Sequence, residues 1–368
     1  MITSNLTLNN NEKVVFNLRS LFNKQGYKQY KMSKFEEYDL YVRNKDFLIS
    51  DSVITFTDTN GKLMALKPDV TLSIIKNTND EPDTIKKVYY DENVYRISKG
   101  TNSFKEITQI GLESIGNIDN YNICEVITLA ANSLNLISDS CVLDVSHLGI
   151  ITALLNAINI PDTATGEVLK CISEKNPHEL YKLCSDLGVS FDNAQLLKTI
   201  ATTYGKPTQV LPMLKDTLSG IIDTYIIDRF SDILENVDDS VKDMIRVDFS
   251  VVSDTHYYNN IVFKGFVEGI PTSVLSGGQY DKLMRKMKRK SGAIGFAVYL
   301  DLLDSLDNNI KNYDVDTVLL YSSTTPLTLI KEQVSSLQSE GLSVYACTKI
   351  PSDLKYKSII KVTECEVD

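Results

Sequence analysis

The chain has 368 residues, of which 43% are apolar and 23% are charged, so it can bury a large core and is too apolar to be mainly disordered. Its 48 acidic residues outnumber its 38 Lys and Arg residues, which gives a formal net charge of −10. A chain with that charge has no overall positive field, so general nucleic-acid binding is disfavoured.

The N-terminal part of the chain predicts helices around a hairpin. Apolar residues spaced three and four apart indicate an amphipathic helix, and Asn60-Gly61 favours the tight turn of a β-hairpin. A proline directly after the hairpin suits the first turn of a helix. The expected elements are a helix over 11–24, a hairpin over 53–67, a short helix after Pro68, and strands at 87–90 and 94–98.

The next strand, predicted over 104–116, carries a polar set on one face. Because strand side chains alternate, Gln109, Gly111 and Glu113 share one face while Ile110 and Leu112 share the other. An acid and an amide beside a glycine make a polar floor with space above it, which suits a small polar ligand. The alternative at this point is a strand whose polar face lies in solvent.

The remainder of the chain continues the pattern of strands and helices. Residues 161–237 are almost wholly helical in pattern, and Gly277-Gly278 is expected to lead from a strand into a helix. The predicted helices are 121–136, 148–158, 280–287, a closing helix over 292–306, and 327–339. The predicted strands are 141–145, 245–252, 257–267, 272–275, 317–321, 343–346 and 358–362.

Strands joined by hairpins rather than by helical crossovers favour a mostly antiparallel sheet with helices packed against it, an α+β fold. We assign residues 1–312 to this core, with a helical insertion at about 161–240, and residues 313–368 to a small C-terminal α/β unit. The sequence has neither a G-x-G-x-x-G nor a P-loop signature, so nucleotide sites of those two kinds are not supported.

The cysteines and histidines indicate no metal site. None of the six cysteines forms a C-x-x-C pair, and the three histidines lack the spacing of zinc ligands. We therefore predict no metal and no cofactor, and a reducing, cytoplasmic compartment. No segment has the length and apolarity of a membrane span or a secretion signal, so no membrane association is expected.

Six segments, in this order, resemble motifs of histidyl-tRNA synthetases, which have the class II aminoacyl-tRNA synthetase fold. Each segment alone is a weak signal, but six in order within about 8–306 are a strong one. The resemblance implies an antiparallel sheet flanked by helices that dimerises through its first motif. The segments are Leu66–Thr71, Val94–Arg96, Thr108–Glu113, Tyr257–Phe263, Gly277–Asp281 and Gly295–Ala297.

The resemblance also implies a set of ligand-binding residues. Arg96 would contact the α-phosphate of ATP and the substrate carboxylate, and Asp69 is one methylene shorter than the Glu that the family usually has. Carboxylates and an amide suit the α-ammonium and the imidazole N–H of histidine, because a buried donor without a partner costs about 1 to 3 kcal/mol. The implied histidine-binding residues are Asp69, Thr71, Arg96, Gln109, Glu113, Tyr257 and Tyr258.

Two arginines of the synthetase motifs are absent. The histidine-specific arginine falls on Ser253, and the arginine of the third motif falls on Leu302. Adenylation depends on positive charge at the α-phosphate, and loss of one such donor lowers the rate by about 10² to 10³. The sequence therefore predicts an inactive synthetase site without catalytic residues. The short C-terminal unit has no basic stripe, so we expect no tRNA partner.

A synthetase-like core without these arginines resembles a family of non-catalytic paralogues, the regulatory subunits of ATP phosphoribosyltransferase. This resemblance implies a short-form catalytic subunit as partner, histidine as ligand, and a homodimer within a hetero-oligomer that controls the first step of histidine biosynthesis. Two alternatives stay open. One is a divergent histidyl-tRNA synthetase in which Lys264 or Arg246 replaces the lost cations; the other is a histidine-sensing or tRNA-modifying paralogue with a different partner.

One basic segment remains outside these motifs. The run from Arg285 to Lys290 contains five Lys or Arg residues among its six. We interpret it as the solvated end of a helix, with contact to a partner that handles phosphate as the alternative.

Overall fold

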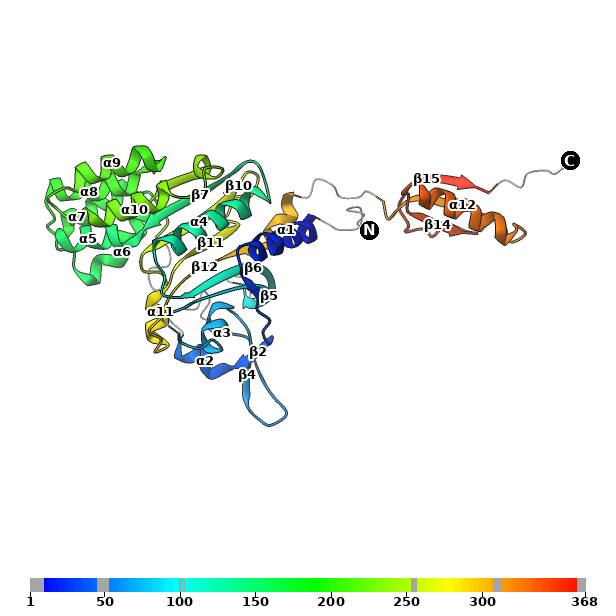
Figure 1. The fold of residues 1–368 in the computed structure, drawn as a ribbon, viewed down its shortest axis with the longest axis horizontal. Helices are drawn as coiled ribbons and strands as arrows, with labels where there is room; N and C mark the ends of the chain where they lie inside the picture. The colour runs from blue at the N-terminus through cyan, green and yellow to red at the C-terminus, as the bar shows by residue number, and fades with distance from the viewer. Residues whose placement is uncertain are drawn as a thin grey trace. The chain divides into compact units, whose positions relative to one another are not determined.

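The computed structural model describes residues 10–44, 53–81, 83–98, 101, 103–252, 257–306 and 313–362. The chain divides into two compact units, one within 1–306 and the other within 307–368, which are each drawn in Figure 1. None of the helices in the described ranges is long and apolar enough to cross a membrane.

A nine-stranded sheet forms the centre of the first unit. Its strands are β1 (Lys28–Gln29), β5 (Ile85–Ile97), β6 (Phe104–Gly116), β7 (Cys141–His147), β8 (Tyr204–Gly205), β9 (Ile245–Asp248), β10 (Ile261–Val267), β11 (Leu275–Gln279) and β12 (Gly292–Tyr299). They are arranged β1-β5-β6-β12-β11-β10-β7-β9-β8. Only β1–β5 and β7–β9 are parallel pairs, so the predicted antiparallel sheet flanked by helices is confirmed.

The two faces of this sheet are covered by different layers (Figure 1). Ile110 and Leu112 of β6 are fully buried in the larger apolar cluster, which includes α1 (Asn10–Lys24) and α4 (Asn120–Asn135). Ile115, on the opposite side of β6 by strand alternation, belongs to a second cluster. The second cluster includes residues of α2 (Tyr38–Arg43), β4 (Leu63–Leu66) and α3 (Thr71–Lys76). These elements form a small layer together with β2 (Phe35–Glu37) and β3 (Thr55–Thr57), which pair with β4.

A group of helices lies between β7 and β9 in the sequence and forms a layer at one end of the unit (Figure 1). Side-chain caps help to define them, since Asn176 and Ser190 each accept a hydrogen bond from a first-turn N–H. Leu197, Leu214 and Phe230 are fully buried and join this layer to the main core. The helices are α5 (Leu148–Ala157), α6 (Asp162–Ser173), α7 (Pro177–Asp186), α8 (Phe191–Thr202), α9 (Pro207–Leu218) and α10 (Tyr225–Glu235).

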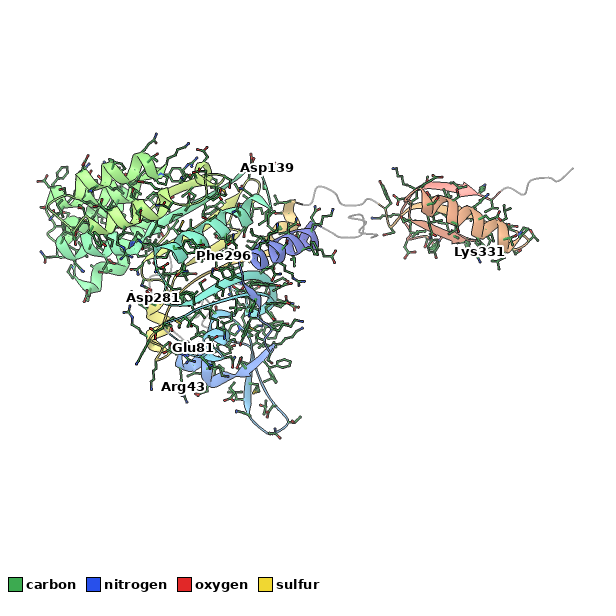
Figure 2. The ribbon with its side chains drawn as sticks, viewed as in Figure 1. Arg43, Glu81, Asp139, Asp281, Phe296 and Lys331 are labelled. Carbon is green, nitrogen blue, oxygen red and sulfur yellow. The ribbon has the colours of Figure 1, made fainter. Side chains whose placement is uncertain are left out.

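The predicted closing helix over 292–306 is wrong. Residues Gly292–Tyr299 form β12, which lies between β6 and β11, and a 3₁₀ helix follows at Leu300–Leu306. A continuous apolar run fits a buried strand and a buried helix equally well, so periodicity alone did not separate them. Figure 2 labels Phe296 of this central strand, whose ring contacts Phe22 of α1.

Two smaller differences have the same origin in strand pairing. The two short strands expected at 87–90 and 94–98 are one strand, because β5 pairs with β6 along its whole length. Gly277 and Gly278 lie inside β11, which continues to Gln279, and the helix expected after them is confirmed as α11 (Asp281–Lys286).

The second unit is a small α/β fold, and its described residues form one helix and one sheet. Its elements are β13 (Val315–Leu320), α12 (Leu327–Ser339), β14 (Val344–Cys347) and β15 (Tyr356–Lys361). β13 is the central strand and pairs in parallel with both neighbours, which buries Val318 and Leu319 completely.

Candidate functional site

Glu113 on β6 is the centre of a buried polar site. Its side chain is 2% exposed. The Thr71 hydroxyl, at the start of α3, donates a hydrogen bond to Oε1 at 2.8 Å, and the Tyr280 hydroxyl donates one to Oε2 at 2.6 Å. Three segments that are distant in the sequence therefore meet at one carboxyl group.

Burial controls the charge of this carboxyl group. The pKa of Glu113 is raised from 4.5 to about 8, mainly because burial removes solvation from the carboxylate, with a smaller contribution from the negative charge of Asp69. The hydrogen bonds from Tyr280 and Thr71 oppose this shift, because they favour the ionised form. The group therefore exchanges its proton near neutral pH, where a bound ligand can change its protonation.

Asp69 lies beside Glu113 and is also buried. Its Oδ1 accepts a hydrogen bond from the Leu72 N–H at 2.8 Å, in the first turn of α3. Burial raises the pKa of Asp69, while the bond from Leu72 and the charge of Arg96 lower it. The Arg96 Nε donates to the Pro68 carbonyl oxygen at 3.1 Å, so this predicted site residue lies next to Asp69.

The tyrosines of the site form an aromatic wall. Tyr257 and Tyr258 precede β10 instead of lying within a strand, and their ring centroids are 4.8 Å apart, edge to face. The Tyr257 and Tyr280 ring centroids are 5.7 Å apart. Burial raises the pKa of Tyr257 and of Tyr280 well above the ordinary value, so both hydroxyls keep their protons and can donate hydrogen bonds.

The predicted polar face of β6 is buried, so the alternative of a solvent-facing strand is wrong. Gln109 is 4% exposed and lies on the same face of β6 as Glu113. The space expected above Gly111 is filled, because a Cβ atom there would lie 2.5 Å from the Tyr90 hydroxyl oxygen. The space beside Gly295 is occupied by Glu113 itself, since a Cβ atom there would lie 1.8 Å from Glu113 Oε2.

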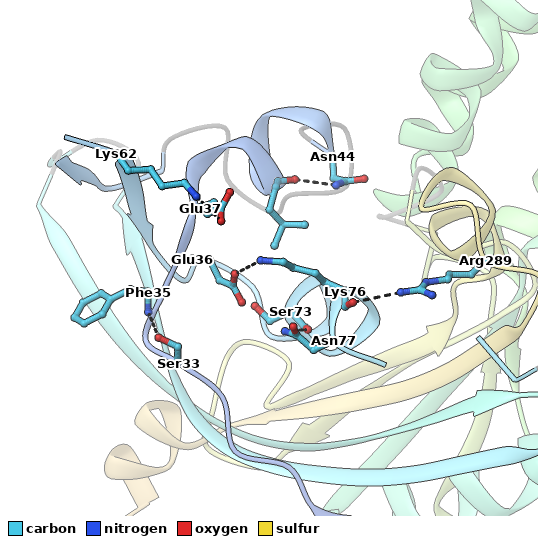
Figure 3. Close-up of polar contacts among 11 residues, drawn as sticks. Ser33, Phe35, Glu36, Glu37, Asn44, Lys62, Ser73, Lys76, Asn77 and Arg289 are labelled. Atoms are coloured by element: carbon cyan, nitrogen blue, oxygen red, sulfur yellow. Dashed lines mark hydrogen bonds and ion pairs between the residues drawn. The ribbon is translucent and has the colours of Figure 1, made fainter. Parts of the chain in front are cut away.

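A set of polar contacts anchors α3, the helix that carries Thr71 (Figure 3). Lys76 Nζ donates to Glu36 Oε2 at 2.7 Å. Arg289 Nη2 donates to the carbonyl oxygens of Ile75 at 3.0 Å and Lys76 at 3.3 Å, at the C-terminal end of the helix. A cation at this end satisfies free carbonyls and favours the helix dipole. The interpretation of the whole basic run as solvated is therefore wrong for Arg289.

Of the two positions where arginines were predicted to be lost, the structure describes one. Ser253 lies outside the described residues. Leu302 lies in the 3₁₀ helix and packs, partly buried, against the larger apolar cluster. An apolar side chain in this packing supplies no positive charge to the site.

Sequence reasoning placed Glu113, Thr71 and Asp69 correctly in one cluster and missed Tyr90 and Tyr280 as members. Tyr280 follows the glycine pair of β11 by two residues, which was the available signal. The structure gives the cluster two buried carboxyl groups surrounded by hydroxyls, an arrangement that suits a ligand with N–H donors. Among the described residues, no group of three or more His, Cys, Asp or Glu side chains could hold a metal ion.

We expect the Glu113 carboxyl to make stability depend on pH. Its pKa of about 8 in the folded chain exceeds 4.5, so the folded state keeps a proton that the unfolded state releases between these values. Its contribution is therefore complete below about pH 4.5 and is lost as the pH rises to about 8, at up to about 1.4 kcal/mol per pH unit. Glu113→Gln should remove that part of the pH dependence.

Urea unfolding of the native chain and of Glu113→Gln at pH 5, 6.5 and 8 measures this effect. Asp144 also has a pKa raised by burial, to about 7, so the difference between the two proteins is the informative quantity. Glu167→Gln, an exposed position on α6, is the control and should reproduce the native pH dependence. Parallel curves for the native chain and Glu113→Gln would contradict the assignment.

Comparison with known proteins gives a consistent set of relatives. The sequence model described as histidyl-tRNA synthetase matches residues 6–303. The chain is 27% identical over 301 residues to a protein of Oceanobacillus iheyensis, which covers 80% of this chain and 73% of the relative. It is 25% identical over 340 residues to a protein of Clostridium kluyveri, which covers 88% and 86%. Both relatives are named ATP phosphoribosyltransferase regulatory subunit.

Solved structures share the fold. An ATP phosphoribosyltransferase regulatory subunit/histidyl-tRNA synthetase from Bacillus halodurans C has a TM-score of 0.77 at 20% identity, covering 96% of this chain and 93% of that chain. The ATP phosphoribosyl transferase (HisG:HisZ) complex from Thermotoga maritima contains a chain with a TM-score of 0.62 at 18% identity, covering 79% and 97%. The class II synthetase-like architecture expected from the sequence is thus confirmed.

Proposed function

The chain belongs to the histidyl-tRNA synthetase family. We propose that this member of the family is a regulatory subunit of ATP phosphoribosyltransferase. In this role it is a non-catalytic subunit of an enzyme complex in histidine biosynthesis. Relatives at 21% to 28% identity that carry this name support the proposal.

The observation that carries the proposal is that the chain keeps the polar ligand site but lacks an arginine of the synthetase motifs. Glu113 and Thr71 are joined by a hydrogen bond beside Asp69, whereas Leu302 packs against the apolar core where the synthetase motif has arginine. Such a site keeps groups that bind an amino acid and lacks the charge that adenylation requires. We therefore infer that the synthetase reaction is absent.

The alternative cations considered for a divergent synthetase are far from Glu113. Lys264 is on β10, and two strands separate β10 from β6. At the usual strand spacing the backbones of these two strands are about 14 Å apart. Arg246 is on β9, separated by four strands, and its Nη1 donates to the Asp243 and Ile245 carbonyls at 2.7 and 2.8 Å. These positions argue against a replacement of the lost arginines.

Histidine is the ligand that we propose for the buried site. Its α-ammonium and imidazole N–H groups are donors, and the buried side chains of Asp69, Gln109 and Glu113 offer acceptors. The aromatic wall formed by Tyr257 and Tyr280 provides a surface on which an imidazole ring can pack.

The partner that we propose is the short-form catalytic subunit, bound by a homodimer of this chain. Sedimentation of the chain alone should give about twice the 41.2 kDa of one chain. Addition of the catalytic subunit should produce one faster species that contains both proteins. A chain that stays separate from the catalytic subunit at micromolar concentrations of both would refute the partnership.

A further inference from the structure

A cavity of about 440 Å³ lies on the opposite side of the sheet from Glu113. It is bounded by α10, the N-terminal end of α5, and the ends of β10 and β11. Gln279, at the end of β11, and Asp281, at the start of α11, line this cavity, while Tyr280 between them donates its hydrogen bond to Glu113. Figure 2 labels Asp281, at the start of α11.

The wall of this cavity is apolar in part and polar in equal part. Ile226, Phe230 and Ile233 line it from α10, and Ile118 and Ile261 line it from the core. A volume of this size, walled by branched and aromatic side chains, fits the apolar body of a small molecule.

His147 adds a buried hydrogen-bond donor to this wall. The side chain is 9% exposed and caps α5, where its Nδ1 accepts the Gly149 N–H at 3.2 Å. Burial lowers the pKa of His147 to about 4, so the ring is neutral near pH 7 and carries its proton on Nε2.

Arg229 adds a positive charge at the rim. Its Nη2 donates to the Asn120 amide oxygen at 2.7 Å, a neutral partner, and none of the ion pairs among the described residues includes Arg229. The guanidinium contributes to the low pKa of His147, which places the two groups in the same electrostatic environment.

Gln279 and Asp281 are two further polar residues of the cavity lining. Gln279 Oε1 accepts the Ile261 N–H at 3.4 Å, which leaves the side-chain NH₂ as a donor. Asp281, the one carboxylate of the lining, is satisfied elsewhere: Oδ1 accepts the Ala293 N–H at 3.0 Å and Oδ2 accepts the Asn259 amide at 3.1 Å. The cavity lining thus holds the Arg229 cation, the His147 and Gln279 donors, the Asn260 amide, and the Asp281 carboxylate, both of whose oxygens already accept hydrogen bonds.

We propose that this cavity binds a small carboxylate with an apolar or aromatic body. The carboxylate would receive hydrogen bonds from His147 Nε2 and Arg229, and the body would lie against Ile226, Phe230 and Ile261. A bidentate contact from arginine is the geometry that guanidinium and carboxylate groups favour. The proposal concerns this second site alone and does not depend on the function proposed for the Glu113 site.

Titration calorimetry of the full chain with phenylacetate tests the proposal. Phenylacetate should bind at one site per chain, and its neutral amide, phenylacetamide, should bind at least about tenfold more weakly because it cannot pair with the guanidinium. Arg229→Gln should lower the affinity for phenylacetate by at least about tenfold. Ile226→Trp should abolish binding by filling the cavity.

Matched controls make the result decisive. Arg43→Gln removes an exposed arginine that is paired with Asp39 and should leave phenylacetate binding unchanged. Arg229 is exposed, so its replacement should preserve the melting temperature, and it remains informative if Ile226→Trp fails to fold. Equal affinities for phenylacetate and phenylacetamide, unchanged affinity in Arg229→Gln, or no binding of phenylacetate would each overturn the proposal.

Discussion

The purified chain should show no histidine-dependent exchange of pyrophosphate into ATP. Two cations that stabilise charge at the α-phosphate are absent from the sequence, at Ser253 and Leu302. Each such donor contributes about 10² to 10³ in rate, so the loss of both should lower exchange by about 10⁴-fold or more if the effects add. Leu302 packs against the apolar core, so an apolar side chain occupies the position at which the synthetase motif has a cation.

The exchange assay needs a positive control and a binding control. An active histidyl-tRNA synthetase, assayed in the same buffer, defines the rate that the chain should fail to reach. Calorimetry with histidine separates a protein that binds without reacting from one that does not bind. Exchange within tenfold of the active synthetase would show that the chain is an enzyme and would exclude the regulatory function.

The second large effect concerns the catalytic subunit. When the chain is added to a short-form ATP phosphoribosyltransferase, formation of phosphoribosyl-ATP should increase, and histidine should inhibit the mixture more strongly than the catalytic subunit alone. A ligand can shift an equilibrium only by its difference in affinity for the two states. A coupling of about 1 to 3 kcal/mol corresponds to a change of about 5- to 150-fold in rate or in histidine affinity.

The same coupling can be measured from the other direction. Histidine changes the affinity between the two subunits by some factor. By reciprocity, the catalytic subunit must change the affinity of the chain for histidine by the same factor. Glu113→Ala should weaken histidine inhibition, because it removes an acceptor of the proposed ligand, whereas Glu167→Ala, exposed on α6, should keep the native response. A mixture whose rate and histidine inhibition equal those of the catalytic subunit alone would exclude the assignment.

Local signals in the sequence predicted much of the fold. The apolar period of α1, the turn at Asn60-Gly61 and the alternation along β6 all depend on residues close together in the chain, and each was confirmed. β12 was misread because its run of apolar residues is compatible with both structures. Its state is fixed by hydrogen bonds to β6 and β11, and these partners are distant in the sequence.

The site shows the same limit at closer range. Motif resemblance identified Thr71 and Glu113, which are 42 residues apart in the chain. It did not identify the contact between Glu113 and Tyr280, which are 167 residues apart. That contact requires the register in which Glu113 lies opposite Gly295, and Gly295 lies opposite Gly278. The absence of a Cβ atom at Gly295 then leaves room for the Glu113 carboxyl group.

The sequence by itself determined the fold class, the presence of a ligand-like polar face on β6, and the absence of arginine at two positions, because residue identity and strand alternation are local properties. Only the tertiary structure decided that this face is buried, that Tyr90 fills the space over Gly111, and that Arg289 caps α3. Burial, the pKa of Glu113 and the separation of the Glu113 site from the cavity beside His147 depend on which strands pair and in which register. Those pairings bring together residues that no local pattern connects.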